Sequence, residues 1–179
     1  MADVVLVIDM QRGFLEEGYP LFCGSAARGI IPSVQKLLER EIARGSTIIF
    51  TADTHAPDDP EFQMWPPHCV EGTEQVEIIP ELASYPGEKV PKTRYSAFYG
   101  TDLGHRLEEL HPEKILVCGC CTDICVLHTV ADARYRDHRV QLYTDCVAVI
   151  DENMARFALK HMDQILGVEL TALGEESPS

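Results

Sequence analysis

Four cysteines lie close together in the segment 117–129, which reads VCGCCTDICVLHT. Their spacings of two, one and four residues do not match the C-x-x-C pair that is typical of a zinc knuckle. A strand-like run meets a helix-like run inside this segment, and Cys125 falls in the first turns of the helix. Exposed N–H groups and the macrodipole at a helix N-terminus favour a thiolate. Cys125 is therefore the best candidate nucleophile, and the alternative is an inert buried cysteine.

A nucleophilic thiol needs a partner that takes its proton and later gives it to a leaving group. Asp9 ends the apolar run DVVLVID, and Lys92 ends the short run EKVPK. We expect Asp9 to be this base and Lys92 to hold it and balance developing negative charge. His128 is a rival base three residues after Cys125, but a neighbour on the same helix rarely reaches the thiol with good geometry. Backbone N–H groups of the turn 121–125 could bind an oxyanion.

A second group of reactive side chains occurs in the segment TADTHAPDDPEFQMWPPHC, which continues from Thr51 to Cys69. Its two imidazoles and two carboxylates suit a first-row divalent metal, and they belong to Asp53, His55, Glu61 and His68. The alternatives are a polar loop with solvated side chains and, less favoured, Cys69 as a ligand. Long loops without regular structure are uncommon unless they are functional, which favours a metal site.

Aromatic residues flank both groups. Scattered aromatic side chains are more often part of a core than of a pocket. Phe14 and Trp65 are the better pocket candidates because both are expected on loops at the edge of the sheet where the reactive residues gather.

These residues need elements that bring them together. Strands are expected at 3–9, 46–53, 88–92, 114–119, 139–145 and 168–173, and helices at 27–44, 101–110, 122–137 and 151–166. The alternation predicts an α/β fold of three layers, with a mainly parallel sheet of about six strands between helices. Ligands of such folds bind outside the carboxyl ends of the strands. The candidate acid, lysine, thiol and metal site all lie at or after strand ends, so we expect them at one edge.

Composition limits the class of protein. The 179 residues are 45% apolar and 25% charged, which predicts one globular domain over 1–179. A formal net charge of −14 repels phosphate backbones and anionic lipids, so we expect neither nucleic acid nor a membrane as partner. The first apolar run is interrupted by Asp9 and is typical of a strand, not of a signal peptide. With seven cysteines and no secretory signal, we expect free thiols and a cytoplasmic location.

Four motifs together resemble the isochorismatase-like cysteine hydrolases over almost the whole chain: VIDMQRGF, DTH with WPPHC and GT, KTRYSAF, and GCCTDICVLHTVADA. The metal segment and WPPHC narrow this resemblance to the nicotinamidase (pyrazinamidase) branch. The resemblance implies a triad of Asp9, Lys92 and Cys125. It also implies a non-proline cis peptide between Cys120 and Cys121, with the N–H groups of Cys121 and Cys125 as oxyanion donors.

The same resemblance implies one divalent metal ion, with zinc expected and iron or manganese as alternatives. Asp53, His55 and His68 would bind it, and Glu61 would fill the place of the ligand that varies among family members. Phe14, Trp65 and Tyr95 would enclose the substrate ring. A homo-oligomer is also expected.

The activity implied is deamidation of nicotinamide, or of pyrazinamide-like analogues, to the acid and ammonia through a thioester, as in pyridine nucleotide salvage. The thiol at position 125 argues against the vinyl-ether chemistry of isochorismatase itself. Two alternatives remain open. One is a metal-free amidohydrolase acting on another amide, carbamoyl or ureido substrate, and the other is a non-catalytic protein that binds a partner.

Overall fold

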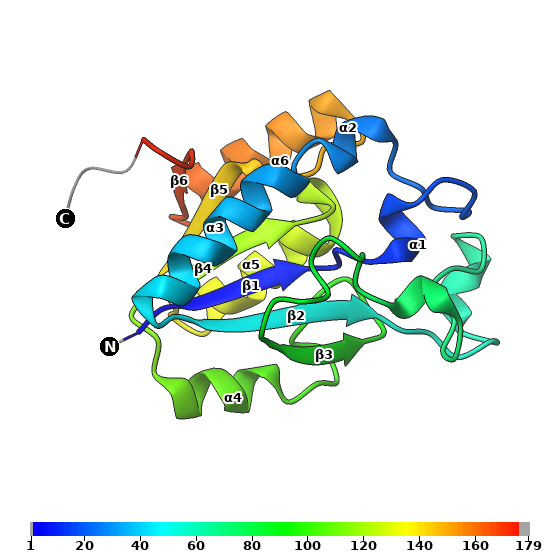
Figure 1. Cartoon of the computed structure of the whole chain (residues 1–179), viewed down its shortest axis with the longest axis horizontal. Helices are drawn as coiled ribbons and strands as arrows, with labels where there is room; N and C mark the ends of the chain where they lie inside the picture. The colour runs from blue at the N-terminus through cyan, green and yellow to red at the C-terminus, as the bar shows by residue number, and fades with distance from the viewer. Residues whose placement is uncertain (1, 176–179) are drawn as a thin grey trace.

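The computed structural model describes residues 2–175 and contains one six-stranded sheet (Figure 1). The strands are β1 (Val4–Ile8), β2 (Thr47–Asp53), β3 (Glu88–Lys92), β4 (Ile115–Gly119), β5 (Val140–Val147) and β6 (Glu169–Thr171). They lie in the order β3-β2-β1-β4-β5-β6, and every neighbouring pair is parallel. The predicted α/β class is thus confirmed. Every residue of β1 and β4 is buried, which explains their uninterrupted apolar sequences.

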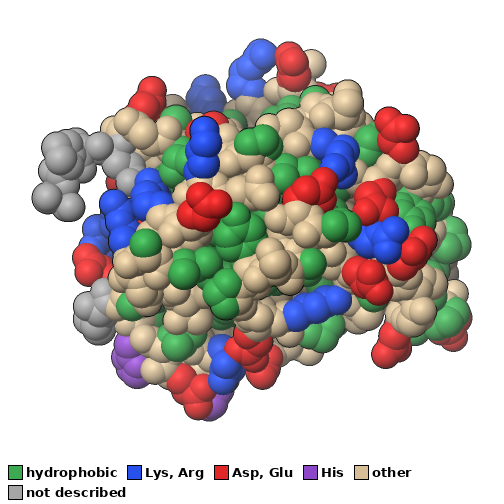
Figure 2. Space-filling view, in the orientation of Figure 1, with side chains coloured by type: hydrophobic (Ala, Val, Ile, Leu, Met, Phe, Trp, Pro, Cys, Tyr) green, Lys and Arg blue, Asp and Glu red, His purple; other side chains and the backbone are tan. Residues whose placement is uncertain are grey.

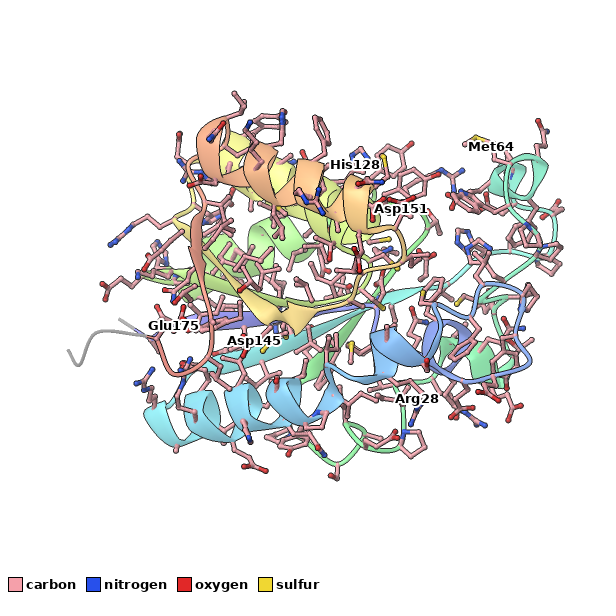
Figure 3. All side chains as sticks on the ribbon, turned by 90° about the horizontal axis from the view of Figure 1, so that it is seen from above. Arg28, Met64, His128, Asp145, Asp151 and Glu175 are labelled. Carbon is pink, nitrogen blue, oxygen red and sulfur yellow. The ribbon has the colours of Figure 1, made fainter. Side chains whose placement is uncertain are left out.

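Helices cover both faces of the sheet, as the view from above shows (Figure 3). One face packs against α1 (Arg12–Leu15), α2 (Ser25–Arg28) and α3 (Ile31–Arg44). The other packs against α4 (Leu103–Leu110), α5 (Leu127–Tyr135) and α6 (Glu152–Gln164). Two separate apolar clusters, one on each side of the sheet, form the core and complete the three expected layers.

The helix expected over 27–44 is two helices in the structure. The chain leaves α2 at Gly29, and α3 begins after Ile30 with a proline in its first turn, where the missing N–H costs nothing. Its end agrees with the expectation, because Gly45 has φ 84° and its N–H reaches the carbonyls of Glu41 and Ile42.

The helices expected over 101–110 and 122–137 also differ at their starts. The first begins at Leu103, whose N–H donates to the Thr101 hydroxyl at 3.2 Å. The second opens with a π-helical turn, η3 (Thr122–Val126), before α5 continues to Tyr135. Such wide turns occur frequently at functional sites.

The strand order makes β1 and β4 the neighbours at which the chain changes direction across the sheet. In open α/β sheets the crevice at this point, outside the carboxyl ends, is the usual ligand site. Gly119 ends β4 with φ 120°, and a Cβ there would lie only 2.0 Å from the Ile8 carbonyl oxygen. Only glycine therefore lets β4 run this close to the end of β1.

The segment between β2 and β3 has little regular structure apart from two short 3₁₀ turns, η1 (Pro60–Gln63) and η2 (Glu74–Val76). The part of this segment that directly follows β2 lies beyond the carboxyl ends of the strands, at the right of Figure 1. On the face shown in Figure 2, acidic and basic side chains are interspersed among apolar ones. No helix within residues 2–175 is long and apolar enough to cross a membrane.

Candidate active site

Asp9, Lys92 and Cys125 meet at the carboxyl ends of β1, β3 and β4. The Lys92 ammonium lies 2.8 Å from Asp9 Oδ2 and 3.5 Å from the Cys125 sulfur. Their exposed fractions are 0% for Asp9, 1% for Lys92 and 7% for Cys125. The structure therefore brings together the three residues that the sequence predicted as a triad, in a site largely closed to bulk water.

The backbone and a hydroxyl hold Asp9 in place. Its φ of 51° is left-handed, which is uncommon for a residue with a side chain and turns the carboxylate out of the strand direction. The Thr51 hydroxyl donates to Oδ1 at 2.7 Å and leaves Oδ2 for the lysine. Thr51 was not identified from the sequence, because nothing in its pattern separates it from an ordinary buried strand residue.

Burial raises the pKa of the Cys125 thiol well above its usual range; the Lys92 ammonium opposes the rise, and Asp9 and Asp53 add to it. Burial also raises the pKa of the Asp9 carboxyl, again against the effect of Lys92. Burial alone would lower the pKa of Lys92, but the surrounding acidic groups raise it well above normal. These shifts favour a neutral Cys125 thiol and make Asp9 a stronger proton acceptor beside the Lys92 ammonium.

The backbone around Cys121 can receive negative charge. The peptide bond between Cys120 and Cys121 is cis. The two neighbouring N–H groups already have acceptors: Cys120 N–H donates to the Ile8 carbonyl, and Thr122 N–H donates to the Ala148 carbonyl. Within the described chain the N–H of Cys121 donates to no protein acceptor, as the oxyanion hole expected from the family resemblance requires.

Four side chains form a compact group next to the triad. One ligand atom from each of Asp53, His55, Glu61 and His68 lies within 4.8 Å of the others. Nε2 of His55 is 3.1 Å, and Nε2 of His68 3.4 Å, from Asp53 Oδ2. Burial, and next the charge of Asp53, raise the pKa of Glu61. Two carboxylates and two imidazole nitrogens that converge in a buried place fit a divalent cation, which would relieve the repulsion between the acids.

The other ring nitrogens of the two histidines are already bonded. Nδ1 of His55 lies 3.0 Å from Asp59 Oδ2, and Nδ1 of His68 lies 2.9 Å from the Pro66 carbonyl. Metal-binding histidines are commonly oriented by such outer partners, which leave Nε2 for the ion. Arg94 in turn donates to Asp59 at 3.0 Å. The position of Asp59 four residues after His55 is the only signal in the sequence that could have identified it.

The backbone of Asp53 is held by the Gln11 side chain. The Gln11 amide donates to the Asp53 carbonyl at 2.9 Å, and its oxygen accepts from the Asp53 N–H at 2.7 Å. The Asp53 carboxylate also accepts from Lys92 at 2.7 Å. Lys92 therefore touches both the triad acid and a candidate metal ligand.

A cavity of about 230 Å³ opens onto Cys125 of the triad and onto three members of the four-residue group, Asp53, Glu61 and His68. Phe14, Trp65 and Tyr95 line it, and Trp65 donates through its indole N–H to the Tyr95 hydroxyl at 2.9 Å. Phe14 was expected on a loop, but it belongs to the short helix α1. The remaining lining residues are Pro20, Leu21, Phe22, Cys23, Cys120, Cys121, Ile124 and Ile150.

The two alternative residues lie elsewhere. His128 is exposed, its ring packs on Tyr95 with centroids 5.4 Å apart, and no hydrogen bond joins it to Cys125 in the described structure. Figure 3 shows His128 on the helical layer above the sheet. Cys69 is fully buried, with its sulfur 3.8 Å from the Gln75 carbonyl. Neither is placed to replace Asp9 or a member of the four-residue group.

Residues 3–172 match the family model described as an isochorismatase domain. A pyrazinamidase/nicotinamidase from Streptococcus mutans superposes with a TM-score of 0.89 at 30% identity, covering 95% of this chain and 100% of that one. A pyrazinamidase of Pyrococcus horikoshii in complex with zinc gives 0.89 at 28% identity, with coverages of 97% and 100%. N-carbamoylsarcosine amidase from Thermoplasma acidophilum gives 0.88 at 30% identity, with coverages of 99% and 100%.

The family model covers nearly all of the chain, and the parallel six-stranded sheet agrees with the α/β class predicted from the alternation of strands and helices. The chain belongs to the isochorismatase family of hydrolases.

Proposed function

We propose that this protein is a metal-dependent cysteine amidohydrolase that deamidates nicotinamide to nicotinate and ammonia and accepts pyrazinamide-like analogues. One observation carries the proposal: the Lys92 ammonium contacts the triad acid, the thiol and Asp53 of the four-residue group at once. An amide at this point would face a nucleophile on one side and ring-orienting ligands on the other. The aromatic walls of the cavity suit a flat ring.

In the first step the Cys125 thiol gives its proton to Asp9, and the sulfur forms a bond to the carboxamide carbon. The carbonyl oxygen becomes an oxyanion that the N–H groups of Cys121 and Cys125 can stabilise. Lys92 keeps its charge and lowers the free energy needed to form a thiolate in this buried site. The proton that Asp9 accepted then passes to the amide nitrogen, the C–N bond breaks, and ammonia leaves a thioester on Cys125.

In the second step Asp9 takes a proton from a water molecule while the water oxygen bonds to the thioester carbon. The C–S bond breaks, and the proton returns to the Cys125 sulfur. The carboxylic acid leaves after losing its own proton. Splitting the hydrolysis in this way replaces attack on a stable amide by water with two easier reactions.

Asp53, His55, Glu61 and His68 would hold a divalent ion, and this mixed nitrogen and oxygen donor set suits zinc, with iron and manganese as alternatives. A bound ion would supply a coordination site for the ring nitrogen. This chain's own residues prepare the place: Asp59 and the Pro66 carbonyl orient the imidazoles, and Gln11 fixes Asp53.

The test is ammonia release by the zinc-loaded protein from nicotinamide and from benzamide, which has the same amide but no ring nitrogen. We expect turnover of nicotinamide, much weaker turnover of benzamide, and loss of nicotinamide turnover after chelation. Cys125→Ala should abolish the activity. Equal rates on both amides, or full activity after verified removal of metal, would contradict the proposal.

A second candidate is hydrolysis of a carbamoyl or ureido compound. It is favoured by the similarity to N-carbamoylsarcosine amidase, which covers 99% of this chain. Such a substrate has no need for the four-residue group as a set. Release of ammonia from an N-carbamoyl amino acid by the metal-free protein, without activity on nicotinamide, would support this alternative. The intact triad argues against a purely non-catalytic binding protein.

A further inference from the structure

A second pair of thiols lies in the wall of the cavity. The sulfurs of Cys23 and Cys121 are 3.3 Å apart, although the residues are separated by 98 positions in the sequence. Each residue is 8% exposed, and both line the cavity. A small molecule that enters the cavity can therefore reach both sulfurs. Neither thiol has a part in the two chemical steps described above.

Both cysteines are held by backbone contacts. The N–H of Cys23 donates to the Phe14 carbonyl at 2.8 Å. Cys121 is fixed by its neighbours, since Cys120 N–H donates to Ile8 at 2.8 Å and Thr122 N–H donates to Ala148 at 3.1 Å. The pair thus joins two anchored segments, the loop before α2 and the turn after β4. A disulfide has a sulfur–sulfur bond of about 2.05 Å, so a shift of roughly 1 Å would suffice to form one.

The two thiols differ in acidity. Hydrogen bonds from the Cys120 and Cys121 thiols lower the pKa of Cys23. The hydrogen bond with Cys120 lowers the pKa of Cys121, but the hydrogen bond with Cys23 and burial outweigh it and raise this pKa well above its usual range. The thiolate is the form that attacks peroxide. Both residues line the cavity and their sulfurs lie 3.3 Å apart, so peroxide can reach Cys23 and Cys121 is close enough to resolve the product.

We propose that Cys23 and Cys121 form an oxidative modification site, which hydrogen peroxide converts to a disulfide in the wall of the substrate cavity. The Cys23 sulfur attacks one peroxide oxygen, the O–O bond breaks, and a sulfenic acid and one water form. The Cys121 sulfur then attacks the Cys23 sulfur, the S–O bond breaks, and a second water leaves. Two thiols lose two electrons and two protons, and one peroxide is reduced to two waters.

The disulfide changes the site because Cys121 carries the N–H proposed to receive the oxyanion. Closing the sulfur pair pulls this residue toward the loop that carries Leu21 and Phe22. A displacement of about 1 Å in a catalytic constellation can reduce the rate by roughly 100-fold. We expect at least a tenfold loss of amidase activity, restored by a dithiol reductant. The expected loss of amidase activity rests on the proposed function, whereas formation of the disulfide does not.

The chemical arm uses the Cys125→Ala protein, in which the nucleophile cannot react. Treatment with hydrogen peroxide should remove the mass of two hydrogen atoms, and digestion without reductant should yield a peptide pair linked through Cys23 and Cys121. Cys23→Ser should prevent this product. Cys146→Ala, which removes a buried thiol outside the cavity, should still form it. Absence of the linked pair, or a link through other cysteines, would overturn the proposal.

The activity arm compares treated with untreated enzyme for each variant, so that basal differences cancel. The natural sequence and Cys146→Ala should lose activity and recover it with dithiothreitol, while Cys23→Ala should retain it. An equal, reductant-reversible loss in Cys23→Ala would place the sensitive thiol at Cys125 and refute the assigned consequence. If the linked peptide forms but no amide is hydrolysed by any sample, the oxidation site stands and the proposed function fails.

Discussion

The Lys92 ammonium and the Asp9 carboxylate lie 2.8 Å apart, and both side chains are closed to solvent. A buried pair of this kind is weak support for stability, because removal of two charges from water offsets much of their attraction. The position of the pair beside the Cys125 nucleophile indicates a role in catalysis. The pair keeps an acid and a cation ready where charge develops, which a solvated pair would not do.

Replacing Lys92 by Met should leave the Asp9 and Asp53 carboxylates close together without their shared cation. We expect activity to fall by at least about 1000-fold and the free energy of unfolding to decrease by about 3 kcal/mol, because a buried charge pair is broken on one side. Amide turnover and urea unfolding measure the two effects. The double variant Asp9→Asn/Lys92→Met should regain part of the stability but no activity. Unchanged stability of K92M would contradict the assigned burial cost.

The pH dependence of kcat/KM should report the raised pKa of Asp9. Asp9 must be unprotonated to accept the thiol proton, so activity is lost as pH falls through its pKa. Because burial raises this pKa, the acid limb should lie above the value of about 3.9 for a solvated aspartate. Thr51→Val removes a hydrogen bond that lowers the pKa, so it should move the limb upward, whereas Thr51→Ser should not. If the pH midpoint of the acid limb is the same in T51V, the limb reports the titration of a group other than Asp9.

Asp59→Asn should weaken zinc binding without removing a ligand. The Asp59 carboxylate bonds to Nδ1 of His55, and loss of such an outer partner typically costs 10–100-fold in metal affinity. Competition with a chromophoric chelator measures this affinity directly. The adjacent and exposed Asp58 offers a matched control, since Asp58→Asn makes the same chemical change. Equal affinity in the two variants would show that Asp59 does not orient His55.

Gly119→Ala should destabilise the whole fold. A Cβ would lie 2.0 Å from the Ile8 carbonyl, and φ of 120° is unfavourable for alanine. We expect a loss of more than about 3 kcal/mol or failure to fold, because β1 and β4 cannot separate without losing their pairing. Gly104→Ala, within α4, is the control: its nearest neighbour would be 3.8 Å away, and it should be neutral or slightly stabilising. Similar denaturation midpoints for the two variants would refute this assignment.

Convergence of the triad was predictable because it follows from the sheet. Lys92 ends β3, Asp9 and Cys125 come after β1 and β4, and the carboxyl ends of parallel strands lie at one edge. Alternation of apolar runs and amphipathic stretches indicates such a sheet without knowledge of side-chain contacts. The fold class and the common location of these residues could therefore be inferred from residue types and order.

The partners that orient these residues could not be predicted in the same way. Thr51 meets Asp9 at the ends of two neighbouring strands, and Asp59 meets His55 within one loop. Cys23 meets Cys121 between two loops whose paths are set by tertiary packing. The break between α2 and α3 and the wide turn before α5 also depend on packing, because the local patterns allow continuous helices. Apolar periodicity identifies which face of an element is buried, but it carries no information on which polar group meets another.

The segment between β2 and β3 has few regular elements, yet it supplies His55, Glu61 and His68 to one small space together with Asp53. An ion bound there would join residues up to 15 positions apart and so hold the loop in its folded conformation. Trp65 lies within the same loop and forms part of the cavity wall. A bound ion would therefore make this part of the cavity wall more rigid. The affinity of the protein for the metal and its affinity for the substrate would then be thermodynamically coupled.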